Sequence, residues 1–258
     1  MNNIQFFLYQ EPKEKIMYWL WRFLLGFIIA ELATLATTLY LHRGSTHGAI
    51  KFSPTVEFLF QIYLWLTTGQ NRQEWVSVHL YHHAHADKKD DPHSPLIEGL
   101  WKIQLFNVFY YCRAARKPEV LYYGRHIRPV GFEKIISKIP GSGIIGLIIG
   151  IGIACFTLGL KTGIIVSALH AFLYVFFLNN LINGWCHARG YKNFPNVVGF
   201  NNRFIAWITM GEGLHNNHHE KPGQADLSVL KSEFDLGYFF AKFLVKHGWA
   251  RFASTTAN

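Results

Sequence analysis

Charged side chains are scarce in this chain: only 16% of its 258 residues are Asp, Glu, Lys or Arg, against about a quarter in ordinary soluble domains. Because 50% of the residues are hydrophobic, the composition argues against a soluble, a disordered and a fibrous protein. Cysteine is also rare. The three cysteines, Cys112, Cys155 and Cys186, have no paired spacing, which excludes a disulfide framework and a CxxC metal site.

Acidic residues are the second shortage. The chain has 16 Asp and Glu against 25 Lys and Arg, and its formal net charge is +9. Eleven of the basic residues lie in 70–142 and eight lie in 184–258. Basic segments that flank apolar runs stay on the cytoplasmic side of a membrane. The excess charge therefore predicts a cytoplasmic location for both segments, with membrane lipid rather than nucleic acid as the partner.

The first long apolar run covers residues 17–41, where only Arg22 and Glu31 are charged. At about 1.5 Å per residue this run can cross a bilayer. Residues 1–16 are too polar to cross, so we expect the N-terminus on the opposite face or in the interface. A second run, 52–68, is shorter and contains an acidic residue, so it predicts either a thin crossing or an interfacial helix.

Two further runs, 143–160 and 163–182, contain no Asp, Glu, Lys or Arg. They predict a transmembrane hairpin that turns at Lys161 and Thr162. The chain is therefore predicted to be one all-α integral membrane domain (1–258) with a helical cap on the cytoplasmic side. Its predicted segments are three spans (17–41, 143–160 and 163–182), the run at 52–68, and the cap (70–142 and 184–258).

Histidine is the residue in excess. Eight of the 14 histidines fall in three clusters: His42 and His47; His79, His82 and His83; His215, His218 and His219. Two clusters have the pattern HxxHH, of which about 0.04 would be expected by chance at this composition. Eight imidazoles are too many for one metal ion and suit two, and imidazole suits Zn, Cu, Fe and Ni alike. The sequence therefore predicts a dimetal site without selecting the metal.

The spacing of the histidines supports a shared site. Residues three and four apart share one face of a helix, so each HxxHH cluster can point at one locus. His42 and His47 are five residues apart and converge only if the helix ends between them, which Gly44 allows. Because the first two clusters then lie on one side of the membrane, we expect the segment 52–68 to lie flat or to re-enter.

The chain carries four motifs in order: HRGSTH (42–47), HLYHHAHADKKDDPHSP (79–95), NGWCHARGYKNF (183–194) and GEGLHNNHH (211–219). They resemble the membrane fatty acyl desaturases of the acyl-CoA Δ9 (stearoyl-CoA desaturase-like) group. The resemblance implies an enzyme that uses two Fe ions, O2 and two external electrons to introduce a cis double bond into a saturated acyl chain. The DPHSP sequence at 91–95 narrows the match to the Δ9-like branch.

The resemblance also implies a set of metal ligands. One iron would be bound by His42, His47, His79, His83 and His218, and the other by His82, His187, His215 and His219. Asn183, one helical turn before His187, would hold a water on its iron. No catalytic residue is expected beyond the ligands. Asp91 and His93 follow the second cluster, and we expect them to orient a ligand from behind.

The acyl chain is expected to run beside the first span. Thr34 lies eight residues before His42, which is about 12 Å deeper at 1.5 Å per residue. Ala30 lies one turn below on the same face, and we expect its carbonyl to accept the Thr34 hydroxyl. We expect these two residues and Trp75 to line the substrate channel. His170, in mid-span, is expected to be a buried hydrogen-bonding or channel-lining residue.

The head group of the substrate stays open. Ser77 and Val78 stand where CoA-using relatives carry an Arg-Asp pair, so acyl-CoA, acyl carrier protein and phospholipid all remain candidates. The sequence contains no His-Pro-Gly-Gly signature of a fused cytochrome b5. We therefore expect a separate ferredoxin, or cytochrome b5 with its reductase, as electron donor. A bacterial inner membrane is favoured over the endoplasmic reticulum.

Three other kinds of protein could contain so many histidines: a diiron hydroxylase or ketolase, a metal transporter and a zinc hydrolase. A diiron hydroxylase or ketolase carries the same histidine clusters. It differs from a desaturase only in the fate of the substrate radical that forms when the first hydrogen is removed: the radical binds oxygen instead of losing a second hydrogen. A metal transporter would place its ligands in the middle of the bilayer, whereas these histidines lie beyond the predicted spans. A zinc hydrolase needs three ligands and one open position. The sequence therefore favours the desaturase.

Overall fold

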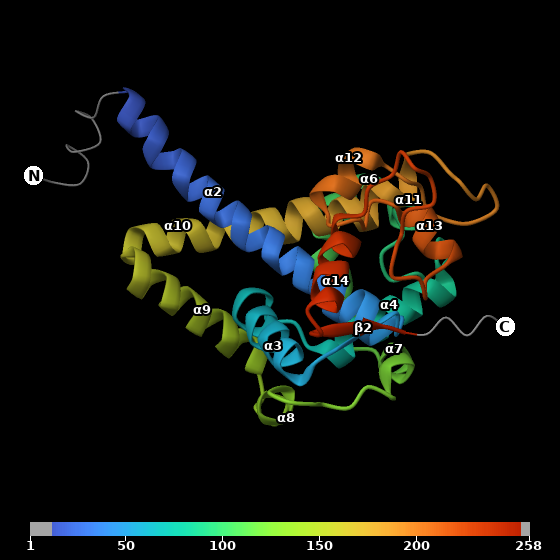
Figure 1. Cartoon of the computed structure of the whole chain (residues 1–258), viewed down its shortest axis with the longest axis horizontal. Coiled ribbons are helices and arrows are strands. Elements are labelled where there is room, and N and C mark those ends of the chain that lie inside the picture. Colours follow the sequence, from blue (N-terminus) through green and yellow to red (C-terminus); the bar gives the residue numbers. More distant parts are fainter. Residues whose placement is uncertain (1–11, 254–258) are drawn as a thin grey trace, which may run out of the picture.

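In the computed structural model, which describes residues 12–253, three apolar helices extend away from a cap of further helices (Figure 1). In chain order the elements are α2 (Pro12–Ala36), η1 (Thr37–Thr46), β1 (Ile50–Phe52), α3 (Pro54–Thr68), α4 (Arg72–His85), α5 (Pro95–Glu98), α6 (Leu100–Ala114), α7 (Pro118–Leu121), η2 (Tyr122–Gly124), α8 (Glu133–Ile136), α9 (Ser142–Leu158), α10 (Leu160–Ala171), η3 (Phe172–Leu178), η4 (Leu181–Trp185), α11 (Cys186–Ala188), α12 (Arg203–Ile208), α13 (His215–Glu220), α14 (Leu236–Lys246) and β2 (Ala250–Phe252). The mainly helical prediction is thus confirmed. The predicted position of the N-terminus lies outside the described residues.

Two helices of the described chain are long and apolar enough to cross a membrane. One runs from Lys13 to Thr46, through α2 and η1, and the other from Leu160 to Ala188, through α10, η3, η4 and α11. The third apolar helix, α9, is shorter, with 17 residues. The turn between α9 and α10 is formed at Gly159 (φ 80°, ψ 149°). The predicted turn at Lys161 and Thr162 is therefore two residues too late, because positive φ at glycine ends α9 first.

The segment predicted at 52–68 is the helix α3, and glycines let it pack closely on α9. A Cβ atom at Gly146 would lie 2.7 Å from Trp65 Nε1, and Cβ atoms at Gly143 and Gly150 would meet backbone carbonyl groups at the end of α3. Small residues on one face allow such backbone contact between helices in a membrane. α3 begins and ends beside the cap, since His47 before it and His79 after it lie with their Nε2 atoms 3.1 Å apart.

A small sheet corrects the all-α prediction. β1 follows the first histidine cluster and pairs antiparallel with β2, with Lys51 opposite Arg251. The pairing ties the C-terminal end of the described chain to the segment between η1 and α3. The cap is therefore closed by contacts between residues about 200 positions apart in sequence, which local patterns cannot predict.

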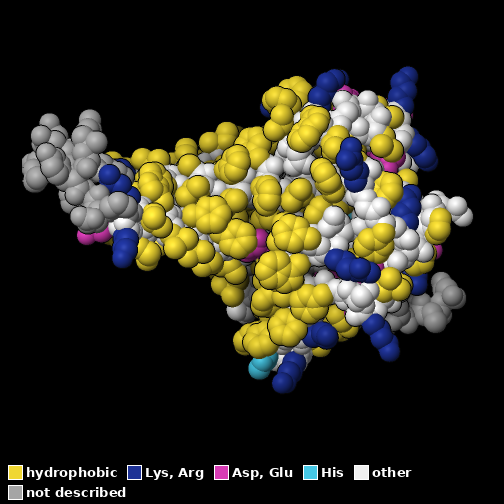
Figure 2. All heavy atoms as spheres, turned by 90° about the horizontal axis from the view of Figure 1, so that it is seen from above, with side chains coloured by type: hydrophobic (Ala, Val, Ile, Leu, Met, Phe, Trp, Pro, Cys, Tyr) yellow, Lys and Arg dark blue, Asp and Glu magenta, His cyan; other side chains and the backbone are white. Residues whose placement is uncertain are grey.

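The surface of the molecule divides by residue type (Figure 2). Apolar side chains cover the long helices, whereas Lys and Arg gather mainly on the cap. Phe156, on α9, is 92% exposed, and Ile148 is 64% exposed. Arg22, the cation inside the first apolar run, is only 6% exposed and donates to Thr162 Oγ1 over 2.8 Å. An apolar belt of this extent suits a lipid surrounding.

Candidate metal centre and acyl cavity

The first histidine pair lies at the π-helix η1, which continues α2 without a break: His42 is within η1, and His47 directly follows its last residue. Its hydrogen bonds run five residues back, and the one from His47 N to His42 O is 3.1 Å long. This wider winding brings residue i+5 over residue i, so the two imidazole rings lie 4.9 Å apart. The predicted helix end at Gly44 is therefore wrong, because the winding of the helix makes the two histidines converge.

The short helix α13, which carries the third cluster, is positioned by asparagines. The side-chain oxygen of Asn201 accepts from the backbone N–H groups of Asn216 and Asn217, at 3.0 and 3.2 Å. The Asn217 side chain donates to Leu227 O over 2.9 Å. The two bonds to Asn201 satisfy backbone N–H groups that a helix leaves unpaired at its start. All three bonds hold a six-residue helix that is too short to be stable alone.

The structure brings all nine histidines into two adjoining groups. In the first group, the ligand atoms of His42, His47, His79 and His218 lie within 4.8 Å of one another. The second group is His82, His187, His215 and His219, with the same limit. His83 joins the first group, since its Nε2 is 3.0 Å from His79 Nε2 and 2.9 Å from His218 Nε2. This division matches the one that the resemblance implies.

The protonation of these imidazoles suits metal binding. Burial, followed by the neighbouring His42, lowers the pKa of His47 to about 2. Burial and neighbouring histidines also lower the pKa of His83 to about 2. A neutral imidazole keeps a nitrogen lone pair, which is the form that binds a cation. The Nε2 atom of His82 is buried without a hydrogen-bond partner, as expected for an atom that faces a metal. The donor set therefore fits two metal ions.

Three carboxylates hold the histidines from behind, of which Asp91 and Glu212 are buried and Asp87 is half-buried. The pairs are His42 Nδ1 with Glu212 (2.9 Å), His82 Nδ1 with Asp91 (2.9 Å) and His187 Nδ1 with Asp87 (3.1 Å). A carboxylate that accepts from Nδ1–H fixes the tautomer and leaves Nε2 free to bind a metal. Of the three, only Asp91 was predicted. Asp87 and Glu212 lie near histidine clusters in the sequence, but no spacing indicates which imidazole each one meets.

Glu212 is itself held by a buried cation. Burial alone would raise its pKa, but His42 and Arg43 lower the pKa of Glu212 to about 2. Thr38 donates to the same carboxylate. Arg43 is 1% exposed and also binds Asp235 through bonds of 2.8 and 3.0 Å. The ionised Glu212 is thus fully compensated, which a buried charge requires.

The remaining predicted site residues lie beside the two groups. Asn183 lines the cavity described below, as does His215. His93 is buried, with its ring 4.7 Å from that of His82, but neither ring nitrogen has a hydrogen-bond partner. Its backbone N–H donates to Asp91 over 3.1 Å. His93 thus supports the carboxylate through its backbone and not through its imidazole.

A cavity of about 310 Å³ lies against the histidines. Thr34 and Trp75 line it, and the Trp75 ring stacks on His79 at 4.9 Å. The predicted bond from the Thr34 hydroxyl to Ala30 O is confirmed, at 3.0 Å. Ala30 itself is fully buried in a packed cluster and lies outside the cavity wall. The expectation that Ala30 lines the channel is wrong for this cavity, because the helix turns that side chain into the packed core.

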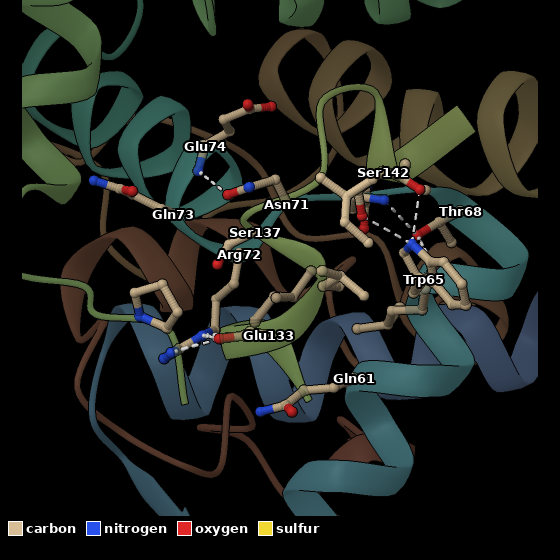
Figure 3. Close-up of a pocket in the computed structure, with 18 of the residues that line it drawn as sticks. Gln61, Trp65, Thr68, Asn71, Arg72, Gln73, Glu74, Glu133, Ser137 and Ser142 are labelled. Atoms are coloured by element: carbon tan, nitrogen blue, oxygen red, sulfur yellow. Dashed lines mark hydrogen bonds and ion pairs between the residues drawn. The ribbon is translucent and has the colours of Figure 1, made fainter. Parts of the chain in front are cut away.

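A larger cavity of about 460 Å³, shown in Figure 3, shares residues 68–71 and Glu74 with the first. None of the nine clustered histidines lines it. Its polar groups bond largely to one another: Arg72 binds Glu133 at 2.9 Å, and Trp65 Nε1 donates to Ser142 O at 2.7 Å. Because these groups are already paired, we assign the acyl chain to the smaller cavity.

Removing the carboxylate behind His82 should weaken metal binding. We expect Asp91→Asn to lower metal affinity by about 10- to 100-fold, because the ring loses the partner that fixes its tautomer. Metal content after dialysis against graded chelator, measured by mass spectrometry, checks this. Asp90→Asn, at the exposed neighbouring residue, is the matched control. Equal metal retention in the two variants would contradict the role of Asp91.

The comparison with known proteins agrees with this geometry. Residues 15–226 match the sequence model of the fatty acid desaturase family. An acyl-CoA C20 Delta5-desaturase of Anemone leveillei is 30% identical over 226 residues, which cover 83% of this chain and 67% of the relative. An sn-1 stearoyl-lipid 9-desaturase of Synechocystis is 27% identical over 215 residues, covering 83% and 65%.

A third relative, a hex-5-enoyl-[acyl-carrier protein] acetylenase of Moorena producens, is 28% identical over 240 residues, covering 84% of this chain and 72% of the relative. The three names specify different acyl carriers, and the two desaturases differ in the position of the double bond. All three names describe enzymes that act on acyl chains. The chain belongs to the fatty acid desaturase family and is an oxidoreductase that acts on fatty acyl chains.

Proposed function

We propose that this protein is an oxygen-dependent desaturase that introduces a cis Δ9 double bond into an esterified saturated acyl chain, at two irons bound by nine histidines. The observation that carries the proposal is the meeting of two groups of imidazoles beside one cavity, whose wall includes His42, His79 and His215. The Δ9 position rests on the DPHSP sequence at 91–95.

Iron is proposed because an unactivated methylene pair can be oxidised only by a redox-active site, and Zn has no redox chemistry. When bound, two Fe ions would supply the electron transfer and O2 activation that this oxidation needs. The nine histidines would hold them, with Asn183 holding a water. The protein's own part is to orient these ligands through Asp87, Asp91 and Glu212 and to exclude bulk water from the cavity.

The described side chains also direct the acyl chain. Trp75, flat against His79, provides an apolar surface beside the proposed reacting carbons. Thr34 and Thr37 line the cavity beyond them. Both hydroxyls are bonded within the protein, to Ala30 O at 3.0 Å and to Tyr174 OH at 2.7 Å. They therefore present their methyl groups to the substrate, which suits the methyl half of an acyl chain.

We further propose that the chain is a single domain (1–258) with three membrane crossings, formed by α2, α9 and α10. In this arrangement α3 lies in the interface or re-enters, and the cap faces the cytoplasm of a bacterial cell, at the inner membrane. The basic residues of 70–142 and 184–258 support this orientation. The partners would be an acyl thioester or acyl lipid, O2 and a separate ferredoxin or cytochrome b5.

Expression in a host with defined lipids tests the reaction itself. We expect new cis double bonds, located by mass spectrometry, in cells that contain the wild type. His82→Ala and His218→Ala should each abolish product while leaving the protein in the membrane, because each removes a proposed iron ligand. His126→Ala, at an exposed histidine outside the clusters, should keep full activity.

The products of the same cultures also distinguish desaturation from hydroxylation. An alcohol in place of the alkene would show a hydroxylase, and full activity of a preparation that contains only Zn would rule out the diiron proposal. The purified wild type is expected to hold about two Fe per chain, since nine imidazoles with one water suit two ions.

Filling the deep end of the cavity should shorten the preferred substrate. Thr34→Phe places a large ring where Thr34, 5% exposed, lines the cavity. Overpacking a closed apolar site costs about 1–3 kcal/mol, so turnover of stearoyl relative to myristoyl chains should fall about tenfold or more. Leu32→Phe, at a residue 47% exposed on the same helix, is the control. Identical chain-length profiles for both variants would place the end of the channel elsewhere.

Cysteine labelling from outside the cell tests the three crossings. In a background without Cys112 and Cys155, Lys51→Cys and Gln70→Cys flank α3 and should resist a reagent that cannot cross the membrane. Lys161→Cys, beside the turn between α9 and α10, should react. Labelling at only one of the two positions that flank α3 would mean that this helix crosses.

A further inference from the structure

The opening of the smaller cavity is marked by the lining residues that also reach the molecular surface. Of the described residues that line this cavity, three are exposed: Asn71, which caps the start of α4, and Val108 and Cys112 on α6. Val108 and Cys112 are four residues apart and therefore share one face of α6. One side of the opening is thus a turn of α6, and Asn71 borders it from the start of α4.

The surface of α6 around this opening is apolar. Five large apolar side chains of this 15-residue helix are between 43% and 70% exposed: Trp101, Leu105, Phe106, Val108 and Phe109. Leu96 and Ile97, on α5 just before it, are 62% and 49% exposed. The charged residues of α6 are all basic, Lys102 and Arg113. An exposed apolar face flanked by basic side chains is typical of a helix that lies in the interface of a membrane.

This apolar face continues the surface of a long apolar helix. α6 packs against η3 and η4, which belong to the helix from Leu160 to Ala188 that is long enough to cross a membrane. The Gln104 side chain donates to Phe176 O at 3.5 Å, and Asn180 donates to Gln104 O at 2.5 Å. Phe172 and Phe176, on η3, are 58% and 42% exposed. In the proposed membrane arrangement, the opening therefore faces lipid.

The interior behind the opening suits an alkyl chain and excludes a phosphate. Among the described residues that line the cavity, none is Lys or Arg, so a phosphate group inside it would find no counter-ion. The hydroxyl groups of Thr34 and Thr37 are bonded within the protein. Outside the cavity, Arg113 directly follows Cys112 and is exposed. A phosphate that stays at the opening therefore has a cation beside it.

Building on the proposed desaturase function, we propose that the acyl chain of a membrane phospholipid enters this cavity sideways from the bilayer, between α6 and the start of α4. The phosphate stays in the interface near Arg113, and the chain passes inward to His42, His79 and His215 on the cavity wall. A CoA thioester or an acyl carrier protein approaches from water and would have to cross apolar side chains that lipid covers. The substrate class is therefore a chain esterified to a bilayer lipid.

The position of the opening can be measured without any turnover, because Cys112 is a natural reporter. The full-length Cys155→Ser variant, in nanodiscs, carries a bimane label at Cys112, since Cys186 is buried. We expect brominated phospholipid to quench this label strongly and aqueous iodide to quench it weakly. Lys89→Cys, at an exposed residue of the cap, in a background that also lacks Cys112, is the control and should show the reverse. Equal iodide quenching of the two labels would place the opening in water and overturn the proposal.

Preformed lipid distinguishes the possible sources of the acyl chain. Cells of the host with defined lipids are grown on isotopically labelled glycerol and deuterated stearate and moved to unlabelled medium before the protein is induced. We expect double bonds in phospholipid molecules that still contain both labels. Double bonds confined to newly made chains, or to deuterated chains transferred to unlabelled glycerol, would show a thioester substrate and overturn the proposal. A wild type that forms no double bonds would instead refute the proposed function, and quenching at Cys112 still decides where the opening lies.

Filling the opening should block entry of the chain. We expect Val108→Trp to lower turnover of stearoyl phospholipid about tenfold, because a large ring overpacks a narrow apolar passage, with unchanged Fe content by mass spectrometry. Ile148→Trp is the matched control, at a residue of α9 that is 64% exposed and lines neither cavity. It should keep the turnover of the wild type. Equal turnover in the two variants would contradict entry beside α6.

Discussion

The structure depends on holding nine imidazoles close together in two adjoining groups that are largely shielded from water. Each ring must present a lone pair at Nε2, and a single added proton would place a cation among partners that already lack water. Burial itself opposes that protonation, as the low pKa values of His47 and His83 show. What burial cannot do is choose between the two ring nitrogens. For three of the rings, those of His42, His82 and His187, a carboxylate makes that choice by accepting from Nδ1.

Each of these carboxylates creates a further demand, because an ionised group in the interior needs compensation of its own. Glu212 obtains it from Arg43, whose second partner is Asp235. Asp87 accepts from the Ser94 hydroxyl at 2.8 Å. The polar network therefore extends outward from the histidines until it reaches groups that neutralise it. This explains why the interior of the cap contains so many charged side chains.

Sequence patterns predicted the histidine clusters and the long apolar helices, because both depend on residue type and local spacing. The same patterns failed where the winding of a helix, or a contact between residues far apart in sequence, determines the geometry. A regular α-helix has backbone hydrogen bonds from each N–H to the carbonyl four residues earlier, and this assumption gave the wrong cause for the convergence of His42 and His47. In η1 the hydrogen bonds run to the carbonyl five residues earlier. Glu212 meets His42 across 170 residues, and no local spacing encodes such a contact. Three glycines of α9 form the surface on which α3 packs, a contact that the apolar character of the run does not predict.

The walls of the cavity are tied to the histidines in different ways. Thr34 and His42 belong to one unbroken helix, so the depth of Thr34 below His42 is fixed by helical rise alone. Tyr111 lines the cavity from α6, which carries none of the nine histidines. α6 is placed by packing against η3 and η4 and by the bond from Asn180 to Gln104 O. The position of this wall relative to the histidines is therefore a tertiary property, which neither helical rise nor local sequence spacing determines.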